Sequence, residues 1–132
     1  MTDQRFSKSE RLAAKKSIEL LFKEPSGSFF AHPIKLTYTL LPQSGGAIAQ
    51  VLLSVPKRNF KKAHDRNRIK RQLREVYRKN KSIAHDCLTS NAQQACFLLG
   101  YVGKEHTPTD ILEQKVVGLL NKFADALAKN NT

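Results

Sequence analysis

The segment from Lys57 to Lys81 constrains the possible folds more than any other part of this sequence. It contains twelve Lys or Arg against two acids, Asp65 and Glu75, so it carries +10 of the chain's net charge of +12. Charged side chains are almost never fully buried without a partner, so most of the segment must lie on the surface. A solubilising surface mixes both signs, whereas one sign in one segment is typical of a face that binds a polyanion. We therefore expect nucleic acid as the first candidate partner and an anionic membrane as the second.

Residues 63–80 of this segment have the spacing of an amphipathic helix. When each residue turns the helix by about 100°, four apolar side chains fall within an arc of about 100°, namely Ile69, Leu73, Val76 and Tyr77. A neighbouring arc of similar width is cationic and contains Lys70, Arg71, Arg74 and Arg78. The pattern predicts a helix that packs on one side and presents a cationic ridge on the adjacent side. The alternative is a basic helix that is merely solvated.

Hydrophobic spacing predicts further elements on both sides of the basic segment. Ser7 and Glu10 form a capping box before an apolar helical pattern, and a later alternating stretch has Tyr38 on the apolar face of a strand. The predicted elements are a helix over 9–23, strands over 34–40, 49–55 and 93–102, and a turn over 42–46. The first strand could begin as early as Phe29, and the third has an apolar centre expected to be buried on both faces.

A last helix is predicted after Thr107, which we expect to be its N-cap, with Pro108 at the first helical position. Its apolar stripe comprises Leu112, Val116, Leu119, Leu120, Phe123 and Leu127. The order of elements predicts an α+β sandwich of one small sheet and packed helices. We expect a single domain over residues 1–132, with frayed ends at about 1–6 and 129–132.

The remaining residues argue against several classes of function. Cys87 and Cys96 are separated by eight residues, which is neither a zinc spacing nor a CxxC pair, so we expect both to be reduced packing residues. The four histidines are scattered, and no metal site is expected. No Ser/His/Asp, Cys/His or paired-carboxylate arrangement is visible, which argues against an autonomous protein enzyme. No apolar run has membrane-spanning length and the first ten residues are polar, so the cytoplasm is the expected compartment.

The chemistry of the basic helix is concentrated in Arg66, Asn67 and Arg68. Arginine stays charged, binds phosphate with two parallel hydrogen bonds and stacks on bases, while Asn67 can bond a base edge or a 2′-hydroxyl. Three consecutive residues fan over about 200° of a helix, so one flat surface cannot use all three equally. Either RNA wraps the helix edge, or one of the three points back to the sheet.

The segment resembles the bacterial ribonuclease P protein family. The resemblance rests on Leu53 to Arg58 (LSVPKR) and on Ala63 to Glu75 (AHDRNRIKRQLRE), which place the family's RNR-x-KR-x-x-R core after a strand and a loop. Flanking segments over 6–22, 36–38, 95–104 and 111–127 are similar to the family's first helix, first strand, closing strand and closing helix. Two departures are Pro56, where the family commonly has a polar residue, and the Asn59–Lys62 loop, which lacks a glycine and is longer by about one residue.

The resemblance implies a two-layer α-β-β-β-α-β-α sandwich with a left-handed βαβ crossover. It implies that an RNA subunit is the catalyst and uses magnesium, and that the protein binds this RNA and the 5′ leader of precursor tRNA. No membrane and no stable protein partner are implied. The implied RNA-binding residues are Lys57, Arg58, Arg66, Asn67, Arg68, Lys70, Arg71, Arg74 and Arg78. The implied leader cleft comprises Phe22, Tyr38, Ser54, Arg66 and Arg74, although Phe22 and Tyr38 also fit ordinary core packing.

Two other nucleic-acid functions compete with this interpretation. A structural RNA-binding protein of ribosomal-protein type fits the charge and the size equally well, and only the motif in its strand-loop-helix context separates the two. A DNA-binding protein with a recognition helix fits less well, because a strand and not a second helix precedes the basic helix.

Overall fold

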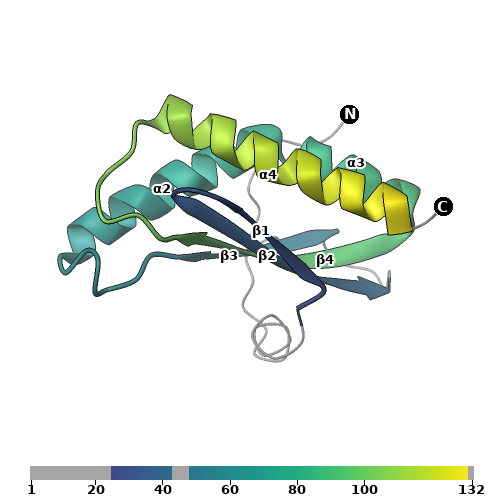
Figure 1. The fold of residues 1–132 in the computed structure, drawn as a ribbon, viewed down its shortest axis with the longest axis horizontal. Coiled ribbons are helices and arrows are strands. Elements are labelled where there is room, and N and C mark those ends of the chain that lie inside the picture. The colour runs from purple at the N-terminus through teal and green to yellow at the C-terminus, as the bar shows by residue number, and fades with distance from the viewer. Residues whose placement is uncertain (1–24, 43–47, 131–132) are drawn as a thin grey trace.

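A computed structural model describes residues 25–42 and 48–130 of the chain (Figure 1). In chain order the described elements are β1 (Gly27–Ala31), β2 (Ile34–Pro42), β3 (Ala49–Ser54), α2 (Ala63–Asn80), α3 (Ser82–Ser90), β4 (Gln93–Tyr101) and α4 (Thr109–Asn130). The predicted helix over 9–23 lies outside the described residues. Of the predicted turn, Pro42 belongs to β2 instead, and the remainder also lies outside them.

The described strands form one mixed sheet in the order β1-β2-β4-β3. Strand β2 is antiparallel to both β1 and β4, whereas β3 and β4 are parallel and are joined through α2 and α3. Helices α2, α3 and α4 all lie over the same face of the sheet (Figure 1). This is the α+β arrangement that the sequence predicts, and the left-handed sense of the β3–β4 connection stays a prediction.

The hydrophobic pattern placed one strand over 34–40, with a start as early as Phe29, but residues 27–31 form a separate strand, β1. Three strands therefore precede the basic helix, as the element order implied by the resemblance has it. The chain turns at His32 and Pro33, so β1 and β2 are a hairpin with Gly27 opposite Tyr38. A Cβ at Gly27 would lie 2.6 Å from the Tyr38 hydroxyl oxygen, so this position accepts only glycine unless Tyr38 moves.

Helix α3 was not predicted, because the hydrophobic pattern indicated no helix between residue 80 and the last strand. It buries Ala84 and Leu88, which lie one turn apart on its inner side. Cys87 is half-buried beside them and its thiol donates to the Ala84 carbonyl over 3.2 Å, while Cys96 on β4 is buried. Burial raises the pKa of the Cys87 thiol, and both cysteines occupy the packing positions expected of them.

The core lies between the sheet and α4. All six residues of the predicted apolar stripe of α4 are at most 2% exposed. Phe123 from that stripe meets the rings of Tyr38 and Phe97 edge-on, at centroid distances of 4.8 and 4.9 Å. The helix begins at Thr109, one residue later than predicted, and it continues through Asn130; the fraying expected at 129–132 stays a prediction. On β4 the second face is buried at Gln94 and Cys96 only, so burial on both faces is confirmed for the first half of that strand.

Candidate RNA interface

The basic helix has the two sides that the sequence predicts. Its buried residues are Ile69, Leu73, Val76 and Tyr77, the four that the apolar arc contains. The adjacent ridge reaches solvent, with Arg71 exposed and Lys70, Arg74 and Arg78 half-buried. Asn67 and Arg68 are also exposed, as are Lys57 and Arg58 in the loop before the helix. The structure therefore places all nine predicted RNA-binding side chains at exposed or half-buried positions on one helix and its leading loop.

Arg66 differs from the others in its contacts, because it is the member of the RNR triplet that turns back toward the loop before the helix. Its Nη1 donates to the carbonyl of Phe60 over 2.6 Å and to that of Lys61 over 2.9 Å. On a helical projection Arg66 lies within about 20° of Leu73 and Tyr77, so it falls inside the apolar arc. The sequence left open which member of the triplet turns inward, and this spacing is the signal that could have identified it.

The loop that carries Phe60 is anchored to the end of β4. Phe60 is 6% exposed, and its ring centroid lies 5.8 Å from that of Tyr101 and 5.2 Å from that of His106. His106 also lies 3.4 Å from the Asp65 carboxylate in the first turn of α2. At the start of the loop, the amides of Asn59 and Phe60 both donate to the Pro56 carbonyl. The chain therefore turns directly after Pro56.

Two amide side chains fix α2 against α4. Gln72 donates to the Thr107 carbonyl over 3.1 Å and to the Thr109 hydroxyl over 3.0 Å. At the C-terminal end of α2, Asn80 Nδ2 donates to the Glu113 carboxylate over 3.0 Å. The middle and the C-terminal end of the basic helix are therefore held against the start of α4.

Two further cations of the basic segment differ from the rest. Arg78 donates from Nη2 to the Glu75 carboxylate over 2.6 Å, and this hydrogen bond is the main reason that the pKa of Glu75 lies below its usual range. Lys81 was counted with the exposed basic segment, but it is only 2% exposed at the junction of α2 and α3. Local charge density cannot reveal such burial, because it depends on how the two helices meet.

The predicted leader cleft is not assembled on one face by the described residues. Tyr38 points to the helix-covered face, where it is 6% exposed and packs against Phe123. Ser54 is exposed at the end of β3, and it points to the opposite face because side chains alternate along a strand and Val51 is buried on the helix side. Phe22 lies outside the described residues. Burial raises the pKa of the Tyr38 phenol, as expected of a packed ring, and its contact with a leader stays a prediction.

Arg74 keeps a donor that nothing satisfies among the described residues. Its Nε atom is buried and has no hydrogen-bond partner in that part of the chain, although the residue is half-exposed. A buried donor left unpaired destabilises the folded chain unless a ligand or water bonds to it. The exposed part of the Arg74 side chain is what can contact a phosphate or base oxygen at the surface of the ridge.

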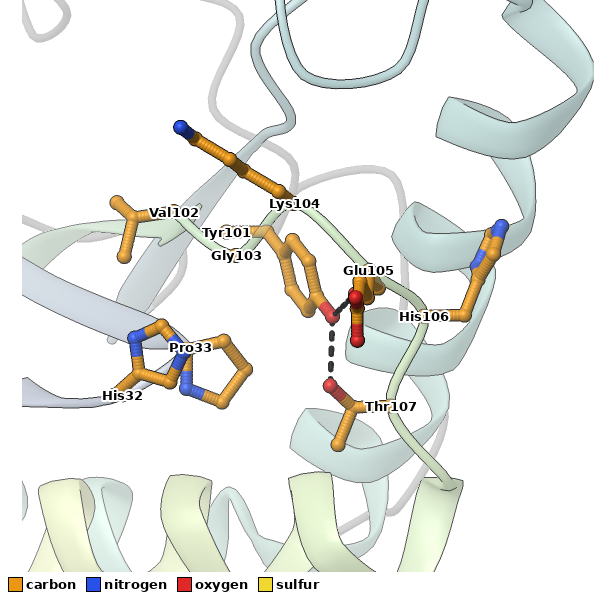
Figure 2. A pocket seen from close by; sticks show the side chains of 9 residues that line it. All are labelled: His32, Pro33, Tyr101, Val102, Gly103, Lys104, Glu105, His106 and Thr107. Carbon is orange, nitrogen blue, oxygen red and sulfur yellow. Dashed lines mark hydrogen bonds between the residues drawn. The ribbon is translucent and has the colours of Figure 1, made fainter.

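A pocket of about 410 Å³ lies beside the N-terminal end of α2, where the β1–β2 turn meets the segment after β4 (Figure 2). Tyr101 donates its hydroxyl to the Glu105 carbonyl and lies 2.7 Å from the Thr107 hydroxyl, with His32 and Pro33 across from it (Figure 2). The pocket contains none of the predicted site residues. Through His106 its rim contacts Asp65 in the first turn of α2.

Comparisons with known sequences identify one family. The family model described as Ribonuclease P matches residues 6–123. The ribonuclease P protein component of Porphyromonas gingivalis is 40% identical over 128 residues, which cover 94% of this chain and 93% of that protein. Among the helices of the described residues, none is long and apolar enough to cross a membrane.

Solved structures share the fold. The ribonuclease P protein of Thermotoga maritima, in complex with 1-(4-fluorophenyl)-2-thiourea, superimposes with a TM-score of 0.65 at 21% identity and covers 85% of this chain and 98% of that one. A ribonuclease P protein mutant of Staphylococcus aureus with defective mRNA degradation activity gives a TM-score of 0.66 at 19% identity, with 89% and 90% coverage. At these identities the likeness shows the fold alone, and the sequence relatives carry the family.

Proposed function

The chain belongs to the ribonuclease P protein family, and we propose that it binds the RNA subunit of that enzyme through the cationic ridge of α2. It is the protein subunit of ribonuclease P, a component of the endoribonuclease holoenzyme that matures the 5′ ends of tRNA. Family membership implies association with the ribonuclease P RNA. Family membership also excludes the alternative function, that of a structural RNA-binding protein of ribosomal-protein type.

The observation that carries the proposed interface is the division of α2 into a buried and a cationic side. Four apolar residues fix the helix on the sheet, and the ridge formed by Lys70, Arg71, Arg74 and Arg78 therefore has a fixed orientation. Guanidinium groups bind phosphate through paired hydrogen bonds, and each phosphate contact releases counterions from the RNA. Asn67 and Arg68 border the ridge, where they can read a base edge or a 2′-hydroxyl.

We further propose that the chain contacts the 5′ leader of precursor tRNA. Arg74 has the unpaired buried donor, Ser54 offers an exposed hydroxyl, and aromatic stacking at Phe22 and Tyr38 would serve single-stranded RNA of any sequence. Because Tyr38 and Ser54 point to opposite faces of the sheet, the leader would have to pass an edge or end of the sheet to meet both.

The chemistry of cleavage is assigned to the RNA subunit. In this proposal magnesium ions are held by that RNA, and the protein raises the local concentration of positive charge around the substrate. Among the described residues no group of three His, Cys, Asp or Glu side chains is arranged to hold a metal ion. The proposed compartment is the cytoplasm, where precursor tRNA is processed.

Reconstitution tests this assignment. The chain is mixed with a bacterial ribonuclease P RNA and precursor tRNA at low magnesium, and cleavage is measured with and without protein. We expect the protein to raise cleavage at low magnesium and to have no cleaving activity when RNA has been removed from it. Specific 5′ cleavage by the RNA-free protein would overturn the division of roles.

A further inference from the structure

The loop before α2 carries cations that the ridge does not include. Lys57, Arg58, Lys61 and Lys62 are all exposed, and Lys62 directly precedes the first residue of the helix. Measured along the helix axis, Lys62 lies about 12 Å before Lys70, and the ridge itself runs about 12 Å from Lys70 to Arg78. Along the helix axis, the cations of the loop and the ridge together therefore cover roughly twice the length of the ridge alone.

A loop presents charges in a fixed direction only where its backbone is held. Arg66 supplies that restraint, because one nitrogen, Nη1, bonds to the carbonyls of Phe60 and Lys61. Phe60 adds a second restraint through its ring contacts with Tyr101 and His106. The Phe60 side chain is thus buried, and the Lys61 carbonyl accepts a hydrogen bond from α2. The side chains of Lys61 and Lys62 are exposed.

We propose that Arg66 is a positioning residue, which holds the Phe60–Lys62 backbone so that Lys61 and Lys62 contact phosphates of the RNA subunit beside the α2 ridge. This inference rests on the proposed function, because it requires α2 to face that RNA. Arg66 then acts on RNA through the two lysines. A direct role for Arg66 as a phosphate ligand is the competing explanation.

The two explanations differ in how binding depends on salt. Log affinity falls as log salt concentration rises. The magnitude of this slope, called the slope below, drops by about 0.7 to 0.9 for each lost phosphate contact. Lys61→Ala/Lys62→Ala is expected to lower the slope by about 1.4 to 1.8. If the contacts contribute nothing at about 1 M salt, this corresponds to a roughly 15- to 30-fold weaker affinity at about 0.15 M. The helix itself is preserved in this variant, because Lys62 makes no side-chain cap hydrogen bond.

The decisive comparison is a cycle of three variants titrated against a bacterial ribonuclease P RNA over a range of salt concentrations. As a positioning residue, Arg66→Ala lowers the slope by the same amount as the lysine pair, and the triple variant loses no more than Arg66→Ala alone. As a direct ligand, Arg66→Ala loses a single contact, and the losses in the triple variant add. Additive losses would therefore overturn the positioning role.

Matched controls separate this inference from the proposed function. Lys122→Ala removes an exposed lysine from α4 and is expected to leave the slope unchanged. Lys70→Ala/Arg71→Ala removes two ridge cations. If the ridge pair lowers the slope and the loop pair does not, the inference is overturned and the proposed function stands. If neither pair changes the slope, α2 does not face the RNA and both are overturned. Circular dichroism melts of each variant confirm that binding is measured on folded protein.

Discussion

Helices α2 and α4 pack on the same face of the sheet, but they present different surfaces to solvent (Figure 1). Helix α4 has three Lys against three acids and buries six residues of its apolar stripe. Helix α2 has seven Lys or Arg against two acids and buries four residues. The comparison teaches that α4 contributes mainly to stability, whereas α2 has enough buried surface to fix its position and uses the rest for binding.

The largest expected effect comes from Phe123→Ala in α4. This ring is 0% exposed and touches both Tyr38 and Phe97, so its removal should lower the free energy of unfolding by about 3 to 5 kcal/mol. Urea denaturation measures this change. The protein that remains folded should bind ribonuclease P RNA with the wild-type salt slope. A loss below about 1 kcal/mol would contradict the assignment of the core to α4.

The aromatic residues of the proposed leader contact come next. Phe22→Ala and Tyr38→Ala should each weaken binding of precursor tRNA to the holoenzyme by about 1 to 3 kcal/mol, because a base loses its stacking partner. Mature tRNA has no leader, so its binding should barely change. Tyr38→Ala should also lower the melting temperature, since the ring is in the core, whereas Tyr38→Phe keeps the ring and should retain most of the preference for precursor.

The outcome of that experiment also decides between the two roles of Tyr38. Equal weakening toward precursor and mature tRNA would leave Tyr38 as a core residue only. In that case the leader contact would rest on Ser54, Arg74 and Phe22.

The smallest expected effect is stronger RNA binding after a substitution in α2. Glu75→Gln removes the partner of Arg78 and one negative charge from the ridge, so affinity for the RNA should rise and the salt slope should steepen by at most about 0.9. Fluorescence titration at two salt concentrations detects this change. Weaker binding of Glu75→Gln would instead show that the ion pair orients Arg78 for the RNA.

The same pair has a defined pH dependence. The pKa of Glu75 is lowered in the folded chain, chiefly by its hydrogen bond with Arg78, so the pair contributes stability above the unfolded pKa. That contribution is lost as the pH falls through the folded value. Glu75 is fully exposed, so the effect on the melting temperature should be small and should diminish further with added salt.

Sequence patterns identified the features of α2 and α4 that depend on a single helix. The apolar arcs of both helices are confirmed residue by residue, because helical periodicity alone determines which side chains share a face. Features that depend on two elements were missed. The burial of Lys81 follows from the junction of α2 and α3, and the hairpin turn at His32 and Pro33 lacks the glycine and asparagine residues that usually mark one.

The site residues show the same limit. The sequence left open whether RNA wraps the helix edge or one member of the RNR triplet points inward. Identifying Arg66 as the inward member requires its helical position to be compared with those of Leu73 and Tyr77. The resemblance implied one cleft for Tyr38 and Ser54, without regard to which face of the sheet each side chain points to. Side-chain alternation together with the pairing of β2, β4 and β3 separates these two residues.

The most direct test of the interface on α2 is the salt dependence of RNA binding by the wild-type chain and by Lys70→Ala/Arg71→Ala. Affinity for a bacterial ribonuclease P RNA is measured from low to moderate salt, with melting curves as the check on folding. We expect a steep wild-type slope, reduced by about 1.4 to 1.8 in the variant at an unchanged melting temperature. A flat wild-type slope, or the same slope in both proteins, would contradict the claim that this ridge binds the RNA subunit.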